Sequence, residues 1–254
     1  MIDLIVSNFR EHATAIPRVC AGMQVQEGPA LVSTDGGGSS DTFNIVFVEN
    51  ASALTQLELA ERQAYYAKQK AAFCLWLPEE ERSPEVLDLL RAEGLQQQDM
   101  AVGMGFSLHD YQLSDERYDN IERVQTAEQM EAYAAVIAAN WSPPDQDVLR
   151  YYRQATPHYL AAGANSYLFV YRHEQEVVAT IELFATDKRT AGIYGLSTKS
   201  AFRRRGIGSA LMVHVMDFAA KNGFENLILH ASEDGLGIYQ RLGFQSYTGL
   251  YEFT

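Results

Sequence analysis

The residues best suited to chemistry in this sequence are three arginines followed by two spaced glycines. They form the run Arg203-Arg204-Arg205-Gly206-Ile207-Gly208-Ser209, between a strand-like segment at 191–198 and a helix-like segment that reaches Asn222. The first N–H groups of a helix have no helical acceptor, and the helix dipole makes that end positive. The two glycines have no Cβ, so a ligand can approach the backbone closely. The run therefore predicts a phosphate site, with a pyrophosphate-bearing cofactor as the expected ligand.

Two common phosphate-binding motifs do not account for this run. The sequence contains no Gly-x-x-x-x-Gly-Lys-Ser/Thr, which argues against a nucleotide-hydrolysing P-loop. The dinucleotide fingerprint requires a third glycine after Gly208, and Leu211 occupies that position. The cofactor is therefore expected to belong to another class of pyrophosphate compound.

Two blocks of the sequence resemble the GNAT acetyltransferase superfamily. The first is Leu196-Ser197-Thr198 followed by Arg203-x-x-Gly206-x-Gly208, and the second is the segment 227–232 followed by 238–244. The second block keeps Tyr239, Gly243 and Phe244 of the family pattern. It departs from the pattern at two positions, where Ser232 replaces the usual asparagine and Gly235 replaces the usual alanine. The resemblance covers about residues 120–254. It implies an α+β fold, in which helices flank a mixed, mostly antiparallel sheet.

The resemblance implies that acetyl-CoA binds as the acyl donor, and that no metal takes part. The backbone of Leu196 and Thr198 would contact the pantetheine arm, and residues 204–209 would hold the pyrophosphate. The complete set of cofactor-binding residues expected from the resemblance is Leu196, Ser197, Thr198, Arg203, Arg204, Arg205, Gly206, Ile207, Gly208, Ser209 and Ser232. Two alternatives stay open, a solvated basic cluster for the arginines and an ordinary helix cap for Ser232.

The resemblance also implies catalytic candidates. Tyr239 corresponds to the frequent general acid of the family, which protonates the departing sulfur. A phenol with an ordinary pKa of about 10 is protonated at neutral pH and is close to a free thiol in acidity. The alternative for Tyr239 is a ring that only packs against the cofactor.

The general base is less defined. Many family members have a glutamate on the strand that runs into the phosphate loop, but the segment 191–198 has no carboxylate. Glu182, on the preceding strand between apolar neighbours, is the first candidate, because burial would raise its pKa. His230 is the second candidate, since histidine titrates near working pH. Alternatives are an outward-facing Glu182, a packed His230, and a water chain without a dedicated base.

The elements that position these residues can be predicted from local signals. Thr126 with Gln129 forms a capping box, Pro143-Pro144 separates two helices, and the turn at 173–176 joins two strands into a hairpin. Gly223 is a good helix stop. The expected elements of this half are strands 121–124, 166–172, 177–185, 191–198, 226–231, 244–248 and 250–254, and helices 126–137, 145–161, 207–222 and 235–242.

The first half contains similar elements without a phosphate loop. Its expected strands and helices are strands 43–48, 73–77 and 102–108, and helices 53–70 and 83–93. The glycine run at 36–40 precedes a strand, so it predicts a flexible hairpin connection. A polar stretch near 108–120 separates the halves. The chain therefore resembles a tandem GNAT protein, with a degenerate, structural domain at 1–114 and the acyl-CoA-binding domain at 115–254.

Composition excludes several classes of function. The net charge is −13 over 254 residues, and residues 1–114 alone have 7 basic and 16 acidic side chains. Such a chain lacks the basic footprint of a nucleic-acid binder. No apolar run approaches the roughly 18 residues of a membrane helix, and two cysteines do not make a disulfide framework. We expect a cytoplasmic protein, with neither nucleic acid nor membrane as a partner and with a possible homodimer.

The function predicted from these observations is transfer of an acetyl group from acetyl-CoA to an amine of a small molecule or peptide. Two alternatives are a non-catalytic acyl-CoA-binding protein, because no base is evident, and an acyltransferase for longer acyl chains.

Overall fold

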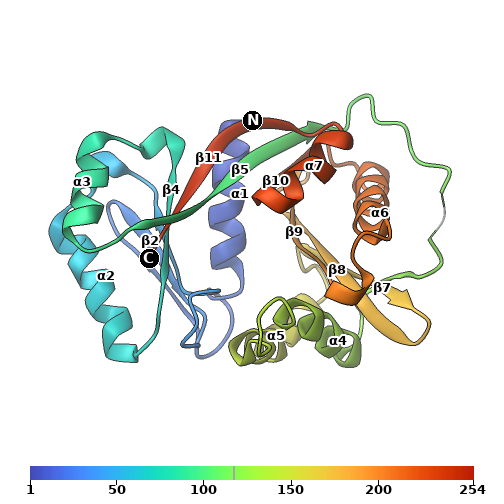
Figure 1. The fold of residues 1–254 in the computed structure, drawn as a ribbon, viewed down its shortest axis with the longest axis horizontal. Helices are drawn as coiled ribbons and strands as arrows, with labels where there is room; N and C mark the ends of the chain where they lie inside the picture. Colours follow the sequence, from blue (N-terminus) through green and yellow to red (C-terminus); the bar gives the residue numbers. More distant parts are fainter. Residues whose placement is uncertain (117) are drawn as a thin grey trace. The chain divides into compact units, whose positions relative to one another are not determined.

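The fold is a mixed α+β arrangement in which most strand pairs are antiparallel (Figure 1). The computed structural model describes residues 1–116 and 118–254, and for Asp234 it describes the backbone alone. Among the pairings whose registers the structure describes, two are parallel, β3 (Ile45–Val48) with β4 (Cys74–Pro78) and β9 (Thr190–Thr198) with β10 (Asn226–Ala231). The predicted fold class, a mostly antiparallel sheet flanked by helices, is confirmed.

The chain forms two compact units. Unit 1 contains residues 1–104, 230–237 and 246–254, and unit 2 contains residues 105–229 and 238–245. Unit 1 includes C-terminal segments because β4 pairs with β11 (Gln245–Phe253), from Leu250 opposite Pro78 to Phe253 opposite Leu75. This division differs from a single cut after residue 114. The boundary between domains 1–114 and 115–254 therefore stays a prediction.

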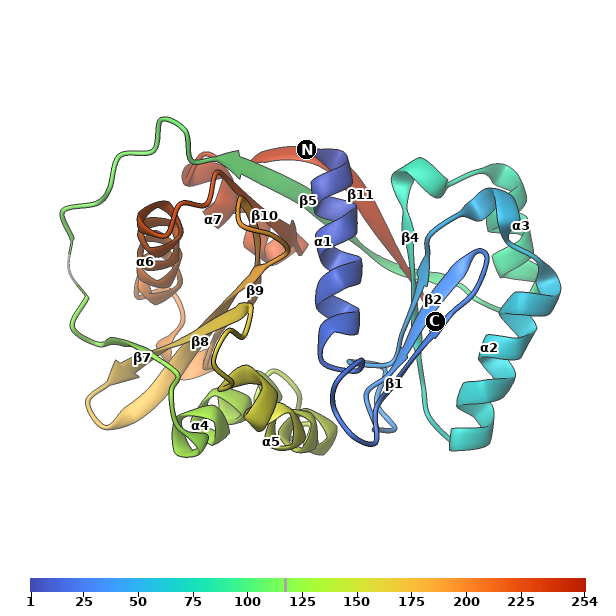
Figure 2. The same cartoon turned by 180° about the vertical axis from the view of Figure 1, so that it is seen from behind.

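In unit 1, β1 (Gln24–Glu27), β2 (Leu31–Asp35), β3, β4 and β11 are hydrogen-bonded in that order. Figure 2 shows α1 (Ile2–Ala15) on one side of these strands, and α2 (Gln56–Gln69) and α3 (Pro84–Ala92) on the other. The unit also contains η1 (Ala51–Ala53), η2 (Glu79–Glu81), part of β5 (Gln97–Ser107), the end of β10 and the first part of α7 (Glu233–Arg241). Fully buried side chains of the core include Leu59, Tyr66, Leu75, Leu77 and Leu90.

Local signals explain the predicted helices of unit 1. Thr55 and Ser83 cap α2 and α3 by accepting hydrogen bonds from Glu58 N and Val86 N. The glycine run at 36–40 lies between β2 and β3, which pair antiparallel, so the predicted hairpin connection is confirmed. The helix α1 and the strands β1 and β2 were not predicted from the sequence. Met1 provides no side-chain cap for α1, so the start of that helix has no sequence signal.

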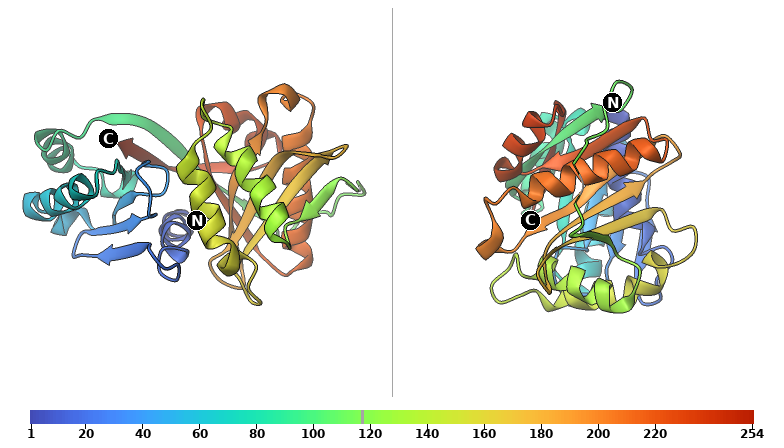
Figure 3. Two further views of the ribbon diagram at one scale, coloured as in Figure 1. Left: turned by 90° about the horizontal axis from the view of Figure 1, so that it is seen from below. Right: turned by 90° about the vertical axis from the view of Figure 1, so that its right-hand side faces the viewer.

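In unit 2 the hydrogen-bonded order is β10, β9, β8 (Glu176–Ala185), β7 (Ser166–His173) and β6 (Ile121–Arg123). Figures 1 and 3 show α4 (Ala127–Ala138) and α5 (Gln146–Tyr159) on one face of β7–β9, and α6 (Ile207–Lys221) on the other. The turn η3 (Ser200–Phe202) joins β9 to the loop before α6. The helix α7 (Glu233–Arg241) has residues in both units.

The predicted elements of unit 2 agree with the structure within a few residues. Gln129 N donates to Thr126 Oγ1 at 3.2 Å, and Gln129 Oε1 accepts from Thr126 N at 3.2 Å, which confirms the capping box. Gly223 ends α6 with φ +83°. One prediction was wrong, because segments 244–248 and 250–254 form the single strand β11. Gly249 does not have a positive φ there, so the backbone passes through it extended rather than turning.

Cys20 and Cys74 are free and buried, in agreement with the expected absence of a disulfide framework. Among the described residues, no helix combines the length and the apolarity that a membrane crossing requires.

Candidate functional site

The loop before α6 has the backbone geometry of an anion site. Gly206 precedes the helix with φ +79°, and Arg204 has φ +61°. No side chain caps this helix start, so the first N–H groups of α6 have no side-chain acceptor. A Cβ at Gly206 would meet no atom within 4 Å, and one at Gly208 would meet only Ile238 Cδ1, at 3.9 Å. Open space therefore lies against these two glycines.

The three arginines beside this loop differ in their contacts. Arg203 Nε donates to Thr198 O at 2.8 Å. Arg205 Nη2 donates to Ala201 O at 2.9 Å, and its guanidinium lies 5.1 Å from the Phe202 ring centroid. Arg204 is exposed, and it forms no hydrogen bond or ion pair with the residues that the structure describes. Arg204 is thus the arginine whose side chain is available to a ligand.

Asn140, which the sequence analysis did not identify, supports the end of β9. Ser197 Oγ donates to Asn140 Oδ1 at 3.1 Å, and Arg203 Nη2 donates to the same oxygen at 3.5 Å. Asn140 lies just after α4, where its own Nδ2 donates to Ile137 O at 3.0 Å. The Ser197 hydroxyl is therefore used within the protein. No sequence motif indicates Asn140, because the contact depends on tertiary packing.

The strand β9 changes its pairing before it reaches the loop. Its parallel register with β10 ends at Ile193 opposite Leu229, and no register continues it among the described residues. On the other edge, Thr180 pairs with Ser197 but Glu182 pairs with Tyr194, so two residues of β9 face one of β8. The extra residue is a β-bulge at Gly195, where φ is +57°. Leu196 and Thr198 lie directly after it.

Glu182 is buried among tyrosines on the α4–α5 face of the sheet. Its exposed fraction is 1%, so the outward-facing alternative is wrong. Tyr194 lies opposite Glu182 in the antiparallel register, which places both side chains on one face. Burial raises the pKa of four tyrosines well above its ordinary value, and the charge of Glu182 raises it further in each case. The four are Tyr133, Tyr152, Tyr159 and Tyr194.

This tyrosine cluster was not predicted as a unit. The ring centroids of Tyr133 and Tyr152 are 5.3 Å apart, and those of Tyr152 and Tyr159 are 5.9 Å apart. Tyr152 and Tyr159 are seven residues apart in α5, which places them on one helix face. That seven-residue spacing is the sequence signal that the two rings lie on one face of the helix. The sequence could not show that Tyr133 of α4 packs against the same rings.

Tyr239 lies in the part of α7 that belongs to unit 2. It is 8% exposed, and its ring centroid is 6.2 Å from that of Phe244. Burial raises the pKa of Tyr239 to about 12. The expected similarity to a thiol in acidity is therefore corrected, because an ordinary thiol pKa is about 8.5. The phenol stays protonated at neutral pH, but full proton transfer from it to a thiolate is uphill.

His230 and Ser232 belong to unit 1. The His230 ring contacts Phe9 edge-on, with centroids 5.0 Å apart. Burial, with a smaller effect of His12, lowers the pKa of His230 to about 3. An imidazole this weakly basic is a poor acceptor for an ammonium proton. Ser232 is exposed just before α7, and its carbonyl accepts from Gly235 N at 3.0 Å.

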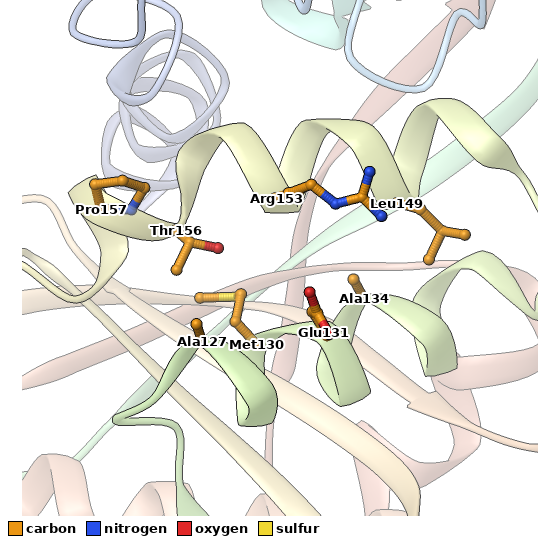
Figure 4. A pocket seen from close by; sticks show the side chains of 8 residues that line it. All are labelled: Ala127, Met130, Glu131, Ala134, Leu149, Arg153, Thr156 and Pro157. Carbon is orange, nitrogen blue, oxygen red and sulfur yellow. The ribbon is translucent and has the colours of Figure 1, made fainter.

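A cavity of about 320 Å³ lies between α4 and α5 (Figure 4). Arg153 of α5 and Glu131 of α4 line it from the two helices, together with the apolar Met130 and Ala134 of α4. None of the predicted cofactor-binding or catalytic residues lines it. Among the side chains that the structure describes, which exclude those of residues 117 and 234, no group of three or more His, Cys, Asp or Glu is arranged to hold a metal ion.

Similar structures exist for almost the whole chain. A GCN5-related N-acetyltransferase from Kribbella flavida is 16% identical, with a TM-score of 0.70, over 98% of this chain and 93% of that one. A conserved protein of unknown function from Staphylococcus epidermidis is 17% identical, with a TM-score of 0.67, over 90% and 91%. A tandem GNAT protein from the clavulanic acid biosynthesis pathway is 11% identical, with a TM-score of 0.62, over 99% and 92%. At these identities the likeness establishes the fold, including that of a tandem GNAT protein.

The sequence comparison concerns the second half of the chain. No curated protein matches the sequence. A profile of the acetyltransferase (GNAT) family matches residues 126–244. This range contains the bulged β9, the arginine-glycine loop, α6 and Tyr239. Residues 126–244 therefore belong to the GNAT acetyltransferase family.

Proposed function

We propose that the chain transfers an acetyl group from acetyl-CoA to an amine of a small molecule or peptide. The observation that carries the proposal is the start of α6, where Gly206 and Gly208 leave open space and no side chain caps the helix. A helix start of this kind favours phosphate through its N–H groups and dipole. Membership of residues 126–244 in an acetyltransferase family supports acetyl-CoA as the phosphate-bearing ligand.

The contacts of the loop indicate which of its residues would bind the ligand and which would support the loop. The N–H groups of residues 207–209 would bind the pyrophosphate, and the exposed Arg204 would add a positive charge. Arg203 and Arg205 would act mainly by holding the loop, because both already bond to backbone carbonyls. Leu196 and Thr198 would offer backbone groups to the pantetheine arm, beyond the point where β9 and β10 stop pairing. Ser232 stays a proposed contact of that arm.

In the proposed reaction, the amine nitrogen attacks the thioester carbon, and the carbon–sulfur bond breaks as the amide forms. The amine proton passes to Glu182, directly or through water or a tyrosine hydroxyl, since the carboxylate is buried. Tyr239 would donate a hydrogen bond to the departing thiolate. Because the pKa of its phenol is about 12, this hydrogen bond is favoured over full transfer of the proton to sulfur. The low pKa of His230 argues against it as the base.

One observation favours a second candidate function, a non-catalytic acyl-CoA-binding protein. The strand β9 has no carboxylate, Glu182 is only 1% exposed, and the exposed Glu176 at the start of β8 is paired with Lys199 at 2.7 Å. A substrate amine therefore has no exposed, unpaired carboxylate on these two strands. Such a protein would bind acetyl-CoA but release no CoA from it, whatever amine is added.

Calorimetry followed by a thiol-release assay tests the proposal. We expect one acetyl-CoA site per chain, and Gly206→Val should weaken binding because its side chain would fill the open space. Unchanged affinity in this variant would show that the loop is not the binding site. Acetyl-CoA with a panel of primary amines should then release CoA. Binding without release for every amine would favour the second candidate, and two equivalent sites would contradict a purely structural first half.

A further inference from the structure

The bulge in β9 is held in place by residues of two other elements. Gly195 has φ +57°, a conformation that residues with a side chain rarely adopt. A bulge leaves one residue out of the hydrogen-bond ladder, so its shape needs support from other contacts. The structure provides two such contacts, one from β8 and one from α4.

The contact from β8 is a hydrogen bond from a buried hydroxyl. Thr180 Oγ1 donates to Gly195 O at 2.9 Å, and Thr180 is 0% exposed. Thr180 is also the last residue of β8 in the register before the shift. The hydroxyl thus binds the carbonyl of the residue whose backbone makes the bulge.

The contact from α4 is steric. A Cβ at Gly195 would lie 2.5 Å from Tyr133 Oη, which is closer than van der Waals contact permits. The next atoms, Ile137 Cδ1 at 3.5 Å and Tyr133 Cζ at 3.7 Å, are at ordinary distances. Tyr133 is 0% exposed, so packing fixes its ring. The hydroxyl therefore fits closely against the bulge and requires glycine there.

We infer that Thr180 and Tyr133 are positioning residues that hold the Gly195 bulge so that the backbone after it meets the acyl group of acetyl-CoA. The inference rests on the proposed function, because it assumes an acyl thioester beside Leu196. Thr180 and Tyr133 do not touch the ligand. They fix the direction of the N–H that the bulge withdraws from the ladder, and a displaced N–H would bind the acyl oxygen less well. CoA without an acyl group lacks that oxygen and would not respond.

The experiment compares acetyl-CoA and CoA binding in the full chain for Thr180→Val, Thr180→Ser and Thr190→Val. Thr190 is an equally buried threonine at the start of β9 and serves as the matched control. Loss of one net hydrogen bond corresponds to roughly a 2- to 10-fold change. Thr180→Val should raise the Kd for acetyl-CoA by that factor and leave the Kd for CoA within about twofold. Thr180→Ser should restore acetyl-CoA binding, and Thr190→Val should change neither Kd. Equal weakening of both ligands by Thr180→Val, or no weakening, would overturn the inference.

Hydrogen exchange of ligand-free protein separates this inference from the proposed function. Failure of the wild-type chain to bind acetyl-CoA would refute the proposed function and, with it, the acyl part of the inference. The bulge contact itself is tested by amide exchange at 193–198, which Thr180→Val should accelerate and Thr190→Val should not. Equal exchange in the two variants would refute the contact.

A second pair of variants tests Tyr133 without relying on Thr180. Gly195→Ala should lower the melting temperature, because it combines a positive φ with the close approach to Tyr133 Oη. Adding Tyr133→Phe removes that oxygen and should restore part of the loss. A double variant no more stable than Gly195→Ala would overturn the role of the Tyr133 hydroxyl.

Discussion

Replacing single arginines of the loop tests which of them binds the cofactor. Arg204→Ala should weaken CoA binding, because Arg204 is exposed and its guanidinium is bonded to none of the described residues. A hydrogen bond to a charged group contributes about 1.5–3 kcal/mol when well formed, and exposed ion pairs contribute about 0.2–1 kcal/mol. For an exposed arginine on a pyrophosphate we therefore expect about 1 kcal/mol, a roughly 5-fold rise in Kd.

Arg205→Ala is the matched control for this prediction. Its guanidinium already bonds to Ala201 O and lies over Phe202, so its removal should change the Kd for CoA by less than about twofold. Calorimetry at low and high salt measures both variants, and the difference between them should shrink at high salt because mobile ions screen exposed charges. Pantetheine, which has no pyrophosphate, should bind equally to both. A larger loss for Arg205→Ala than for Arg204→Ala would refute the assignment.

Three further predictions concern other parts of the chain. Tyr239→Phe should lower the turnover rate by at least roughly 10-fold with acetyl-CoA affinity kept within a few-fold, and equal turnover would make Tyr239 a packing residue. A fragment of residues 115–254 should be less stable than the whole chain in urea, because it lacks β4, with which Leu250 and Phe253 (0% and 4% exposed) pair. Burial of each such side chain contributes about 1.5–3 kcal/mol. A fragment as stable as the whole chain would contradict this prediction. His230 should make the chain less stable in acid, because its pKa is about 3 when folded and 6.5 ordinarily. Between these two pH values the imidazole is protonated in the unfolded chain but neutral in the folded one. The contribution of neutral His230 to the free energy of unfolding is therefore complete above pH 6.5 and is lost as the pH falls toward 3. A His230→Gln variant should lose less stability over that range, and an identical pH profile would exclude the effect.

Much of the second half could be predicted from sequence because its signals are local. The capping box at Thr126, the turn at 173–176 and Gly223 each mark a boundary within a few residues. The helix α1 has no such signal at its start, and the two strands expected at 244–248 and 250–254 form one strand, in which Gly249 has no positive φ. Local patterns therefore located most elements, but they missed α1, β1 and β2 and divided β11 into two strands.

The site was predictable to the same extent. The loop 203–209 could be recognised because its arginines and glycines are contiguous, but which arginine is available depends on folded contacts such as Arg203 with Thr198. Asn140, Thr180 and Tyr133 could not be found, because they reach β9 only through the packing of α4 and the pairing of β8. Likewise, the acidity of Tyr239 depends on its burial, which sequence does not reveal.

Acetyl-CoA is proposed to bind at the start of α6 and beside the bulged part of β9. A crystal structure of the full chain with acetyl-CoA tests this most directly. The pyrophosphate should accept hydrogen bonds from the N–H groups of residues 207–209, with Arg204 beside it and the pantetheine arm along Leu196 and Thr198. Acetyl-CoA bound instead in the cavity between α4 and α5, or against residues of the first half, would contradict the account.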